Sequence, residues 1–208
     1  MKIAFCFDLD GTLTKEEILP QIAKKVGIYE EIDLLTNITM QGLITFDKSF
    51  KLRVKLLSSI PISEVKEVVN EIVIDDHLQA FIQKHKVNCF IITGNLDVWV
   101  KDFIQDKYGC QFYSSVAEAN GNQLVGITHT INKADAIKEL RKEYDYIVSI
   151  GDGMNDCSMF EKSDKSIAYG GVHQPVLSLI KSSDYVCYDS TTLINLLESI
   201  NNSFHENK

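Results

Sequence analysis

The chain opens on Ile3-Ala4-Phe5-Cys6-Phe7, and this run leads directly into Asp8-Leu9-Asp10-Gly11. Five consecutive apolar residues are typical of a strand buried on both faces, as in parallel sheets covered by helices on both sides. Two carboxylates at the end of a buried strand are costly unless something binds them. The stretch therefore predicts a central parallel strand with an acidic ligand site at its carboxyl end.

The same pattern returns twice along the chain. Residues 88–94 read NCFIITG and residues 146–152 read YIVSIGD, each an apolar run that closes on a small or acidic residue. Weaker strand-like runs occupy residues 112–116, 166–168 and 185–187, and helical patterns occupy 78–85, 97–108, 134–143, 157–162 and 191–200. Strands alternating with helices predict an α/β fold, a doubly wound Rossmann-like parallel sheet with ligands at the carboxyl ends of its strands.

One segment breaks this alternation. Between residues 16 and 74 there is no strand-like run, and apolar residues recur at helical spacing, as in Ile18, Ile22 and Val26. We therefore expect a helical-bundle insert over residues 15–75, after the first strand of a core formed by residues 1–14 and 76–208. The polar residues 201–208 are expected to fray.

Composition narrows the class of protein. The formal net charge is -8, from 29 acidic and 21 basic residues, and no basic stripe is visible, which argues against a nucleic-acid partner. No stretch reaches the roughly 20 apolar residues of a membrane span, and residues 3–7 are too few for the apolar part of a signal peptide. Five cysteines without a C-x-x-C pair suggest neither disulfides nor zinc. We expect a cytoplasmic protein with no membrane partner.

The acidic residues at two strand ends predict a metal site. Asp8 and Asp10 follow the first strand, and Gly151-Asp152-Gly153-Met154-Asn155-Asp156 follows a later one. Parallel strands bring their carboxyl ends to one edge, so both groups meet there. Mg²⁺ is the hard cation that takes one or two carboxylates and keeps room for water and phosphate. For Asp156, a helix N-cap is the alternative role.

Groups suited to an anion fall at the same edge. Thr93-Gly94 closes a strand and offers a hydroxyl and a backbone N–H at a helix start, Lys133 precedes a helix, and Asn155 adds an amide. For Lys133, the alternative is an ordinary surface lysine. Together with the carboxylates, these groups describe a phosphoryl-transfer site. Asp8 is then the nucleophile, and Asp10 protonates the leaving alkoxide and later activates water.

In this order and on these strands, the stretches resemble the four motifs of the haloacid dehalogenase superfamily of phosphohydrolases: Asp8 to Leu13, Thr93-Gly94, Lys133, and Gly151 to Asp156. The insert resembles the helical cap of phosphoserine phosphatases. Glu17 stands nine residues after Asp8, and residues 40–46 (MQGLITF) and 53–57 (RVKLL) are similar to the cap segment that clamps the amino acid in that family.

The resemblance implies a role for each matching residue. Asp8 would be the phosphorylated nucleophile and a Mg²⁺ ligand, and Asp10 would be the general acid and base and lend its backbone carbonyl to the metal. Asp152 would complete the protein ligands, with Asp156 in support. The residues implied to hold the phosphoryl group are Thr93, Gly94, Lys133 and Asn155. The residues implied to face the rest of the substrate are Glu17, Met40, Phe46 and Arg53.

Asn95 departs from the family pattern. Phosphoserine phosphatases usually continue the second motif as Gly-Gly, whereas this chain has Gly94-Asn95, which puts a side chain beside the substrate. The resemblance implies Mg²⁺-dependent hydrolysis of O-phosphoserine. Asn95 keeps open the same chemistry on another small phosphorylated metabolite, or phosphoryl transfer to an alcohol. The sequence does not distinguish a monomer from a homodimer.

Three other readings compete with this one. Dehalogenation on the same fold has no use for a second acid at Asp10 or for a magnesium site. A non-enzymatic module would be expected to have lost one of the central acids or Lys133. Arg53 could instead lie on a solvated helix face, and Glu17 could simply be an acid at a helix start, where the helix dipole favours it. The five histidines show no ligand spacing, so we expect them to be surface or satisfied residues.

Overall fold

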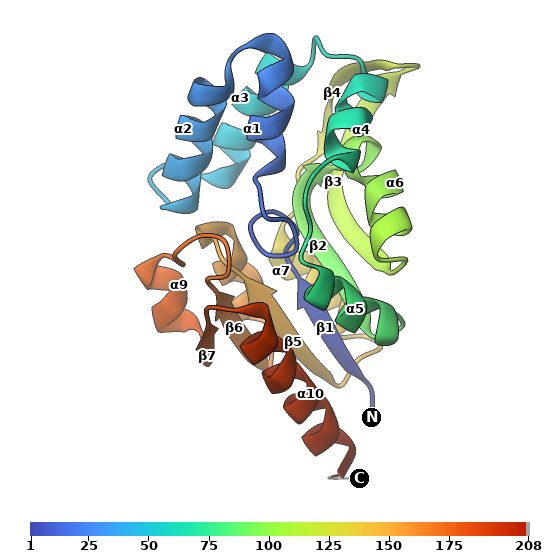
Figure 1. Cartoon of the computed structure of the whole chain (residues 1–208), viewed down its shortest axis with the longest axis vertical. Coiled ribbons are helices and arrows are strands. Elements are labelled where there is room, and N and C mark those ends of the chain that lie inside the picture. The colour runs from blue at the N-terminus through green and yellow to red at the C-terminus, as the bar shows by residue number, and fades with distance from the viewer. Residues whose placement is uncertain (207–208) are drawn as a thin grey trace.

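The computed structural model describes residues 1–206 and is built around a seven-stranded sheet (Figure 1). The strands are β1 (Ile3–Phe7), β2 (Cys89–Leu96), β3 (Gln111–Asn120), β4 (Gln123–His129), β5 (Tyr146–Gly151), β6 (Lys165–Tyr169) and β7 (Tyr185–Cys187). Their spatial order is β4-β3-β2-β1-β5-β6-β7, and every neighbouring pair is parallel except β3 and β4. The predicted doubly wound α/β fold is confirmed.

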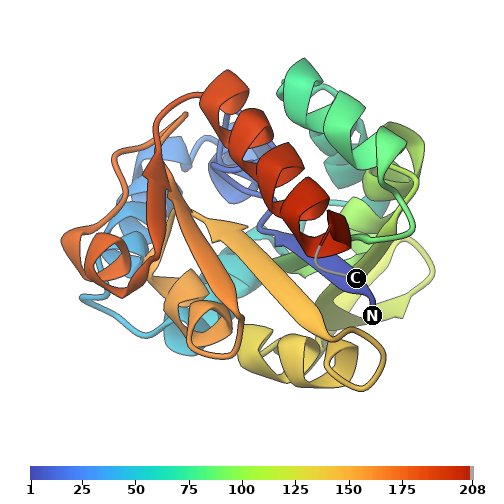
Figure 2. The same ribbon diagram turned by 90° about the horizontal axis from the view of Figure 1, so that it is seen from below.

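Helices cover both faces of this sheet because β1 is apolar throughout. Its odd-numbered side chains, such as Phe5, enter a core with α5 (Asp76–Lys84), α6 (Asp97–Lys107) and α10 (Ser190–Glu206). Its even-numbered side chains enter a second core with α7 (Lys133–Leu140), α8 (Cys157–Phe160) and α9 (Leu177–Ser182). Figure 2 shows the sheet between these two helical layers. Alternation of side chains along a strand thus supplies both cores.

The stretch between β1 and α5 is helical. It contains α1 (Ile18–Ala23), the 3₁₀ turn η1 (Lys24–Val26), α2 (Tyr29–Met40), α3 (Phe46–Leu57) and α4 (Ile62–Asn70). In Figure 1, α1, α2 and α3 group together beyond the carboxyl end of β1, whereas α4 lies beside α6. Most of this insert therefore stands over the sheet edge, and α4 anchors it to the core.

The two chain segments that join the insert to the core run side by side. Thr14 forms a single antiparallel bridge with Ile74. The amide of Lys15 donates to the carbonyl of Val73 at 2.8 Å, and the amide of Asp75 donates to the carbonyl of Leu13 at 3.0 Å. The insert therefore leaves and re-enters the core at one place.

The structure corrects several sequence-based boundaries. The sequence did not predict β4, which pairs with an extended β3. Residues 93–94 do not start a helix, because β2 continues to Leu96 before α6 begins. Residues 201–206 are not frayed, because α10 runs through them and Phe204 lies 5.5 Å, between ring centroids, from Tyr146; residues 207–208 lie outside the described part. No helix within residues 1–206 combines the length and apolar character needed to cross a membrane.

Candidate active site

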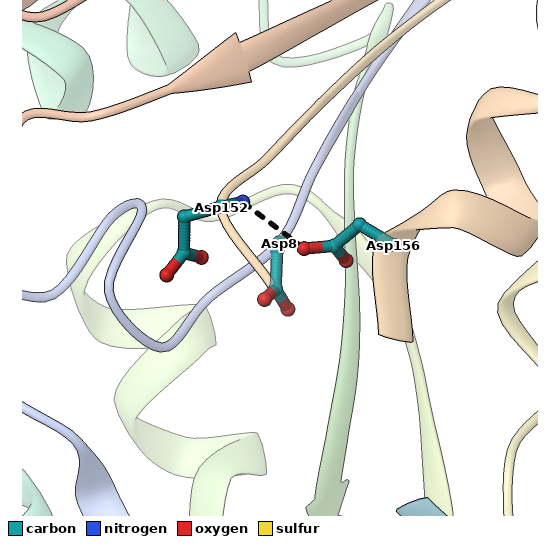
Figure 3. A group of neighbouring side chains, drawn as sticks. All are labelled: Asp8, Asp152 and Asp156. Atoms are coloured by element: carbon teal, nitrogen blue, oxygen red, sulfur yellow. Dashed lines mark hydrogen bonds between the residues drawn. The ribbon is translucent and has the colours of Figure 1, made fainter. Parts of the chain in front are cut away.

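Three carboxylates meet at the carboxyl edge of β1 and β5 (Figure 3). Asp8 follows β1 directly, and its amide donates to the carbonyl of Ile150 in β5 at 2.9 Å. Asp152 follows β5, and Asp156 lies at the end of the 3₁₀ turn η2 (Met154–Asp156). One oxygen of each carboxylate lies within 4.8 Å of one from each of the others, and all three residues are buried. This is the topological switch point of the sheet, where such folds bind ligands.

Lys133 neutralises two of these carboxylates. Its Nζ lies 2.5 Å from Asp8 Oδ1 and 2.6 Å from Asp156 Oδ1, and the side chain is buried at the start of α7. Burial alone would lower the pKa of Lys133, but the carboxylates of Asp156 and Asp8 outweigh that effect and raise it. Lys133 is therefore a buried cation held by its partners, and not a surface lysine.

Asp156 is tied to the backbone as well as to Lys133. Its Oδ2 accepts hydrogen bonds from the amides of Asp152 and Gly153, both at 3.0 Å. Asp156 stands at the predicted N-cap position of the following α8, but its side chain forms no cap hydrogen bond to that helix and accepts instead from the amide of Gly153 at the start of η2. A Cβ at Gly151 would collide with the Asp156 carboxylate, so glycine is needed there for the strand to approach it.

Asp152 lacks a counter-charge. Its Oδ1 accepts a hydrogen bond from Thr12 Oγ1 at 3.0 Å, but its Oδ2 is buried and has no hydrogen-bond partner within residues 1–206. A Cβ on Gly11, whose φ is +67°, would stand 2.6 Å from that oxygen. Burial, and then the negative charge of Asp156, raises the pKa of Asp152 well above its usual value, and the same two causes raise that of Asp8. An orphaned oxygen among buried acids suits a cation, so the residues present fit a metal ion.

Asp10 lies beside this cluster and faces the insert. Its Oδ1 accepts a hydrogen bond from the amide of Ile18 at 2.9 Å, and its Oδ2 accepts one from the side-chain amide of Asn95. Burial and the nearby Glu17 raise the pKa of Asp10 to about 7, although both hydrogen bonds act to lower it. A carboxyl group with this pKa can both give and take a proton near neutral pH.

A pocket extends from the carboxylates to the helical insert. The sequence-predicted residues that line it are Asp8, Asp10, Glu17, Met40, Phe46, Arg53, Gly94, Asn95, Asp152 and Asn155. The other three predicted residues lie behind its wall: Lys133 lines an adjoining pocket, while Asp156 and Thr93 are fully buried. The topology therefore brings residues from both ends of the chain, and from core and insert, to one place.

The wall opposite the carboxylates is formed by Phe46, which stacks on Phe50 of the same helix at 5.1 Å between ring centroids. The ring of Phe46 rests on Gly94, where a Cβ would collide with it. Beside it, Thr93 Oγ1 accepts hydrogen bonds from both the main-chain and the side-chain nitrogen of Asn95. The Thr93 hydroxyl hydrogen is thereby left to donate elsewhere.

Arg53 is buried in α3 and points into the pocket region. Its Nη1 donates to Thr36 Oγ1 in α2 at 2.8 Å, while its Nε is buried without a hydrogen-bond partner within the described chain. Burial lowers the pKa of Arg53, and the negative charges of Glu17 and Asp10 oppose that effect. The solvated-surface alternative for Arg53 is therefore wrong.

The sequence reasoning missed three residues here. Thr12 holds Asp152, and Thr36 holds Arg53; Thr36 lies four residues before Met40, a helical spacing that places both on one face. His173, expected to be a surface or satisfied residue, has Nε2 3.5 Å from Glu17 Oε1 and lies beside Gly11. Nothing near His173 in the sequence indicates this, because its partner lies far away in the chain.

Known proteins resemble this chain over nearly its full length. A phosphoserine phosphatase from Methanocaldococcus jannaschii is 28% identical over 207 residues, covering 93% of this chain and 95% of that protein. A solved structure of a substrate-bound phosphoserine phosphatase complex is 25% identical, with a TM-score of 0.83 over 94% of this chain and 98% of that one. A phospho-aspartyl intermediate analogue of phosphoserine phosphatase, 24% identical over the same shares of each chain, has the same fold with a TM-score of 0.81.

A family model gives the family assignment. The model for haloacid dehalogenase-like hydrolases matches residues 5–161 of the 208, a range that holds the carboxylates, Lys133 and the whole insert. The order of the sheet and the site at its switch point agree with that match. The chain belongs to the haloacid dehalogenase-like hydrolase family.

Proposed function

We propose that this protein is a Mg²⁺-dependent phosphomonoesterase that hydrolyses O-phosphoserine to serine and phosphate through an aspartyl-phosphate intermediate. The observation that carries the proposal is the pairing of Asp8 with Lys133 beside a pocket that Arg53 and Glu17 of the insert also line. The core supplies a nucleophile and a cation for the phosphoryl group. The insert supplies a positive charge on Arg53 and a negative charge on Glu17, which match the carboxylate and the ammonium group of an amino acid.

Asp8 is the nucleophile in this proposal. Lys133 holds its Oδ1, which orients the carboxylate and leaves Oδ2 for attack on phosphorus. A bond forms between Asp8 and phosphorus while the bond from phosphorus to the serine oxygen breaks. Asp10 gives its proton to that leaving oxygen, and with a pKa of about 7 it can afterwards take one from water. The activated water attacks phosphorus and releases phosphate and free Asp8.

Asp8, Asp152 and the main-chain carbonyl of Asp10 would hold the Mg²⁺ ion, which neutralises charge on the transferring group when bound. Asp152 Oδ2 supports this assignment, because it is the buried carboxylate oxygen without a partner in the described residues. Asp156 has a supporting role, since both of its oxygens already accept hydrogen bonds. Thr93, Gly94, Lys133 and Asn155 hold the phosphoryl oxygens.

The cap, which we place at residues 15–75, recognises the amino acid. Arg53 binds the substrate carboxylate, for which its unpartnered Nε is suited, and Glu17 binds the ammonium group. Met40 and Phe46 close the pocket around the carbon chain and exclude water while Asp8 is phosphorylated. The partner in this proposal is a small phosphorylated metabolite, and the acidic net charge of the protein argues against a nucleic-acid partner. The protein acts in the cytoplasm, as a monomer or homodimer and without a membrane partner.

The test is a panel of phosphate esters offered to the purified protein with Mg²⁺. Phosphoserine is compared with phosphothreonine, phosphoethanolamine and sugar phosphates, and we expect kcat/KM to be highest for phosphoserine. Glu17→Gln keeps the shape of the side chain but removes its charge. Because Glu17 also raises the pKa of Asp10, we expect some loss on every ester and a larger loss on esters that carry an ammonium group. A tenfold preference for an ester without the amino-acid moiety, on the order of 1.4 kcal/mol, would contradict the substrate assignment. An added alcohol that lowers the yield of free phosphate would identify a phosphotransferase.

A further inference from the structure

Asn95 occupies an unusual place in this pocket. It lies near the end of β2, is 4% exposed, and lines the pocket between Gly94 and the carboxylate of Asp10. Sequence reasoning placed its side chain beside the substrate. The hydrogen bonds of this residue point to a different role.

Both hydrogens of the Asn95 side-chain amide are donated to the protein itself. Nδ2 donates to Asp10 Oδ2 and, at 3.1 Å, to Thr93 Oγ1. The structure places the amide nitrogen, and not the carbonyl oxygen, of Asn95 against Asp10 Oδ2 and Thr93 Oγ1. No amide hydrogen is left to donate to a substrate carboxylate.

The hydrogen bond to Asp10 completes a two-point hold. The amide of Ile18, at the start of α1, donates to Oδ1, and Asn95, in β2, donates to Oδ2. One donor alone leaves a carboxylate free to turn about the axis of that hydrogen bond, whereas two donors on opposite oxygens fix its plane. The plane decides which lone pair faces the phosphate ester.

We propose that Asn95 is a positioning residue, which holds the Asp10 carboxyl group in the orientation from which it protonates the leaving oxygen. This inference rests on the proposed function, in which the bond from phosphorus to the leaving oxygen breaks as the proton of Asp10 passes to that oxygen. Proximity and alignment of a proton donor contribute to the rate only when the donor is held in place.

The leaving group offers a readout that a merely structural role would not move. An alkoxide or a phenolate leaves poorly without a proton, whereas p-nitrophenolate is stable as the anion and leaves without one. A misplaced Asp10 therefore slows formation of the phosphoenzyme from phosphoserine and phenyl phosphate but spares its formation from p-nitrophenyl phosphate. The later hydrolysis, in which Asp10 activates water, is common to all three esters, so the readout is release of the leaving group. Because phenyl and p-nitrophenyl phosphate differ only in the nitro group, their ratio isolates the leaving group from recognition of the amino acid.

The experiment measures the rate of leaving-group release in a single turnover, with the steady-state KM, for wild type, Asn95→Gly, Asp10→Asn and the double variant on these three esters. We expect Asn95→Gly to reduce that rate for phosphoserine and phenyl phosphate by about tenfold, a part of what a general acid contributes. KM should change little, and p-nitrophenyl phosphate should lose less than about threefold. The double variant should be no slower than Asp10→Asn, since Asn95 acts through Asp10.

Three results would overturn the inference: equal losses on all three esters, a rise in KM confined to phosphoserine, or no loss at all. Asn95→Ala provides a second route to the same ratio if the glycine variant melts at a lower temperature. A failure of the proposed function is distinguishable, because it shows in the wild type as absent phosphoserine turnover. A failure of the role of Asn95 shows only in the ratio between variants on the aryl esters.

Discussion

The two ends of the pocket are built in different ways. At the core end, Asp8, Asp152 and Asp156 sit on strand ends and on a backbone turn. Lys133 holds Asp8 and Asp156, main-chain amides also hold Asp156, and Thr12 holds Asp152. At the cap end, the one side-chain hydrogen bond of Arg53 within residues 1–206 runs from its Nη1 to Thr36 on a neighbouring helix. Rigid main-chain anchoring suits chemistry that tolerates little displacement, while side-chain contacts between helices suit a recognition surface. We therefore expect the reaction to depend on the core and the choice of substrate to depend on the cap.

The largest effect should come from removing the nucleophile at the core end. Asp8→Asn keeps the shape of the side chain but cannot form the phosphoenzyme, so turnover should fall below about a hundredth of wild type. The loss should be the same for phosphoserine and p-nitrophenyl phosphate, because both esters use the core. Steady-state kinetics checks this, with circular dichroism for the fold and mass spectrometry to exclude deamidation. Activity above that limit on either ester would refute the role of Asp8.

Metal removal should also act on the core alone, and on stability as well as activity. We expect excess EDTA to abolish turnover and Mg²⁺ at about a hundred times its Kd to add about 2.7 kcal/mol to the free energy of unfolding. That corresponds to a rise in Tm on the order of 5–10 °C for a chain of this size. Asp152→Asn should remove most of the rise. Full activity in EDTA, with no metal bound, would rule out the metal.

The same carboxylates give the metal-free protein a pH dependence. The pKa values of Asp8 and Asp152 are raised on folding above 3.8, so the folded chain binds protons more tightly than the unfolded chain does. The contribution of these two groups to the free energy of unfolding is therefore greatest below about pH 4 and is lost as the pH rises through their folded-state pKa values. The rise in Tm with Mg²⁺ should be larger at pH 8 than at pH 5. Equal rises in Tm at both pH values would contradict the assignment of these carboxylates as metal ligands.

At the cap end, the expected effect is smaller and depends on the substrate. Arg53→Ala removes a charge-assisted contact worth about 1.5–3 kcal/mol, so kcat/KM for phosphoserine should fall on the order of ten- to a hundredfold. For p-nitrophenyl phosphate, which has no carboxylate, it should hold within a few fold. Arg53→Lys should recover only part of the loss, because an ammonium lacks the planar fork.

Lys51→Ala is the matched control, since Lys51 is an exposed cation on the same helix that pairs with Asp47. Lys51→Ala should leave kcat/KM unchanged for both phosphoserine and p-nitrophenyl phosphate. Equal losses on both esters in Arg53→Ala would mean that Arg53 supports the phosphate or the cap and does not read the carboxylate.

The smallest effect concerns the contact between His173 and Glu17 at the junction of core and cap. The carboxylate of Glu17, 3.5 Å from the imidazole Nε2, raises the pKa of His173 above 6.5. The stabilisation is therefore fully present below about pH 6.5 and is lost as the pH rises through the folded-state pKa. Because the imidazole is 38% exposed, we expect less than about 1 kcal/mol.

Urea unfolding of wild type and His173→Gln at pH 5.5 and pH 8.5 checks this, with the exposed His77→Gln as control. The difference between wild type and His173→Gln should shrink at the higher pH. A difference that grows with pH would reverse the sign of the argument.

The division between core and cap also explains what could be predicted from the sequence. Asp8 and Asp152 were predictable because apolar runs define β1 and β5, and parallel pairing aligns their ends whatever the rest of the chain does. The β4 strand was not predictable in this way, because its residues are mostly exposed and form no continuous apolar run. Gly121, with φ +57° at the turn, was the local signal for that hairpin.

The side-chain contacts were the least predictable part of the site. Asn95 could be singled out as a departure from the family pattern, but its hydrogen bond to Asp10 spans 85 residues of sequence. His173 and Glu17 are further apart still. Such pairs depend on where the loops and helices settle once the core has formed, and no local propensity encodes that placement.

The two segments that join the insert to the core pair at Thr14 and Ile74, and this pairing affects how an enzyme of this kind can acquire new substrates. Because the inserted chain departs and returns through adjacent, hydrogen-bonded segments, its length and sequence can change without moving β1 or α5. We therefore expect α1, α2 and α3 to be replaceable as a unit, while α4, which packs on α6, keeps the insert attached to the core. A library confined to residues 18–57 should yield folded variants with new ester preferences that still require Asp8, which separates the evolution of specificity from that of catalysis.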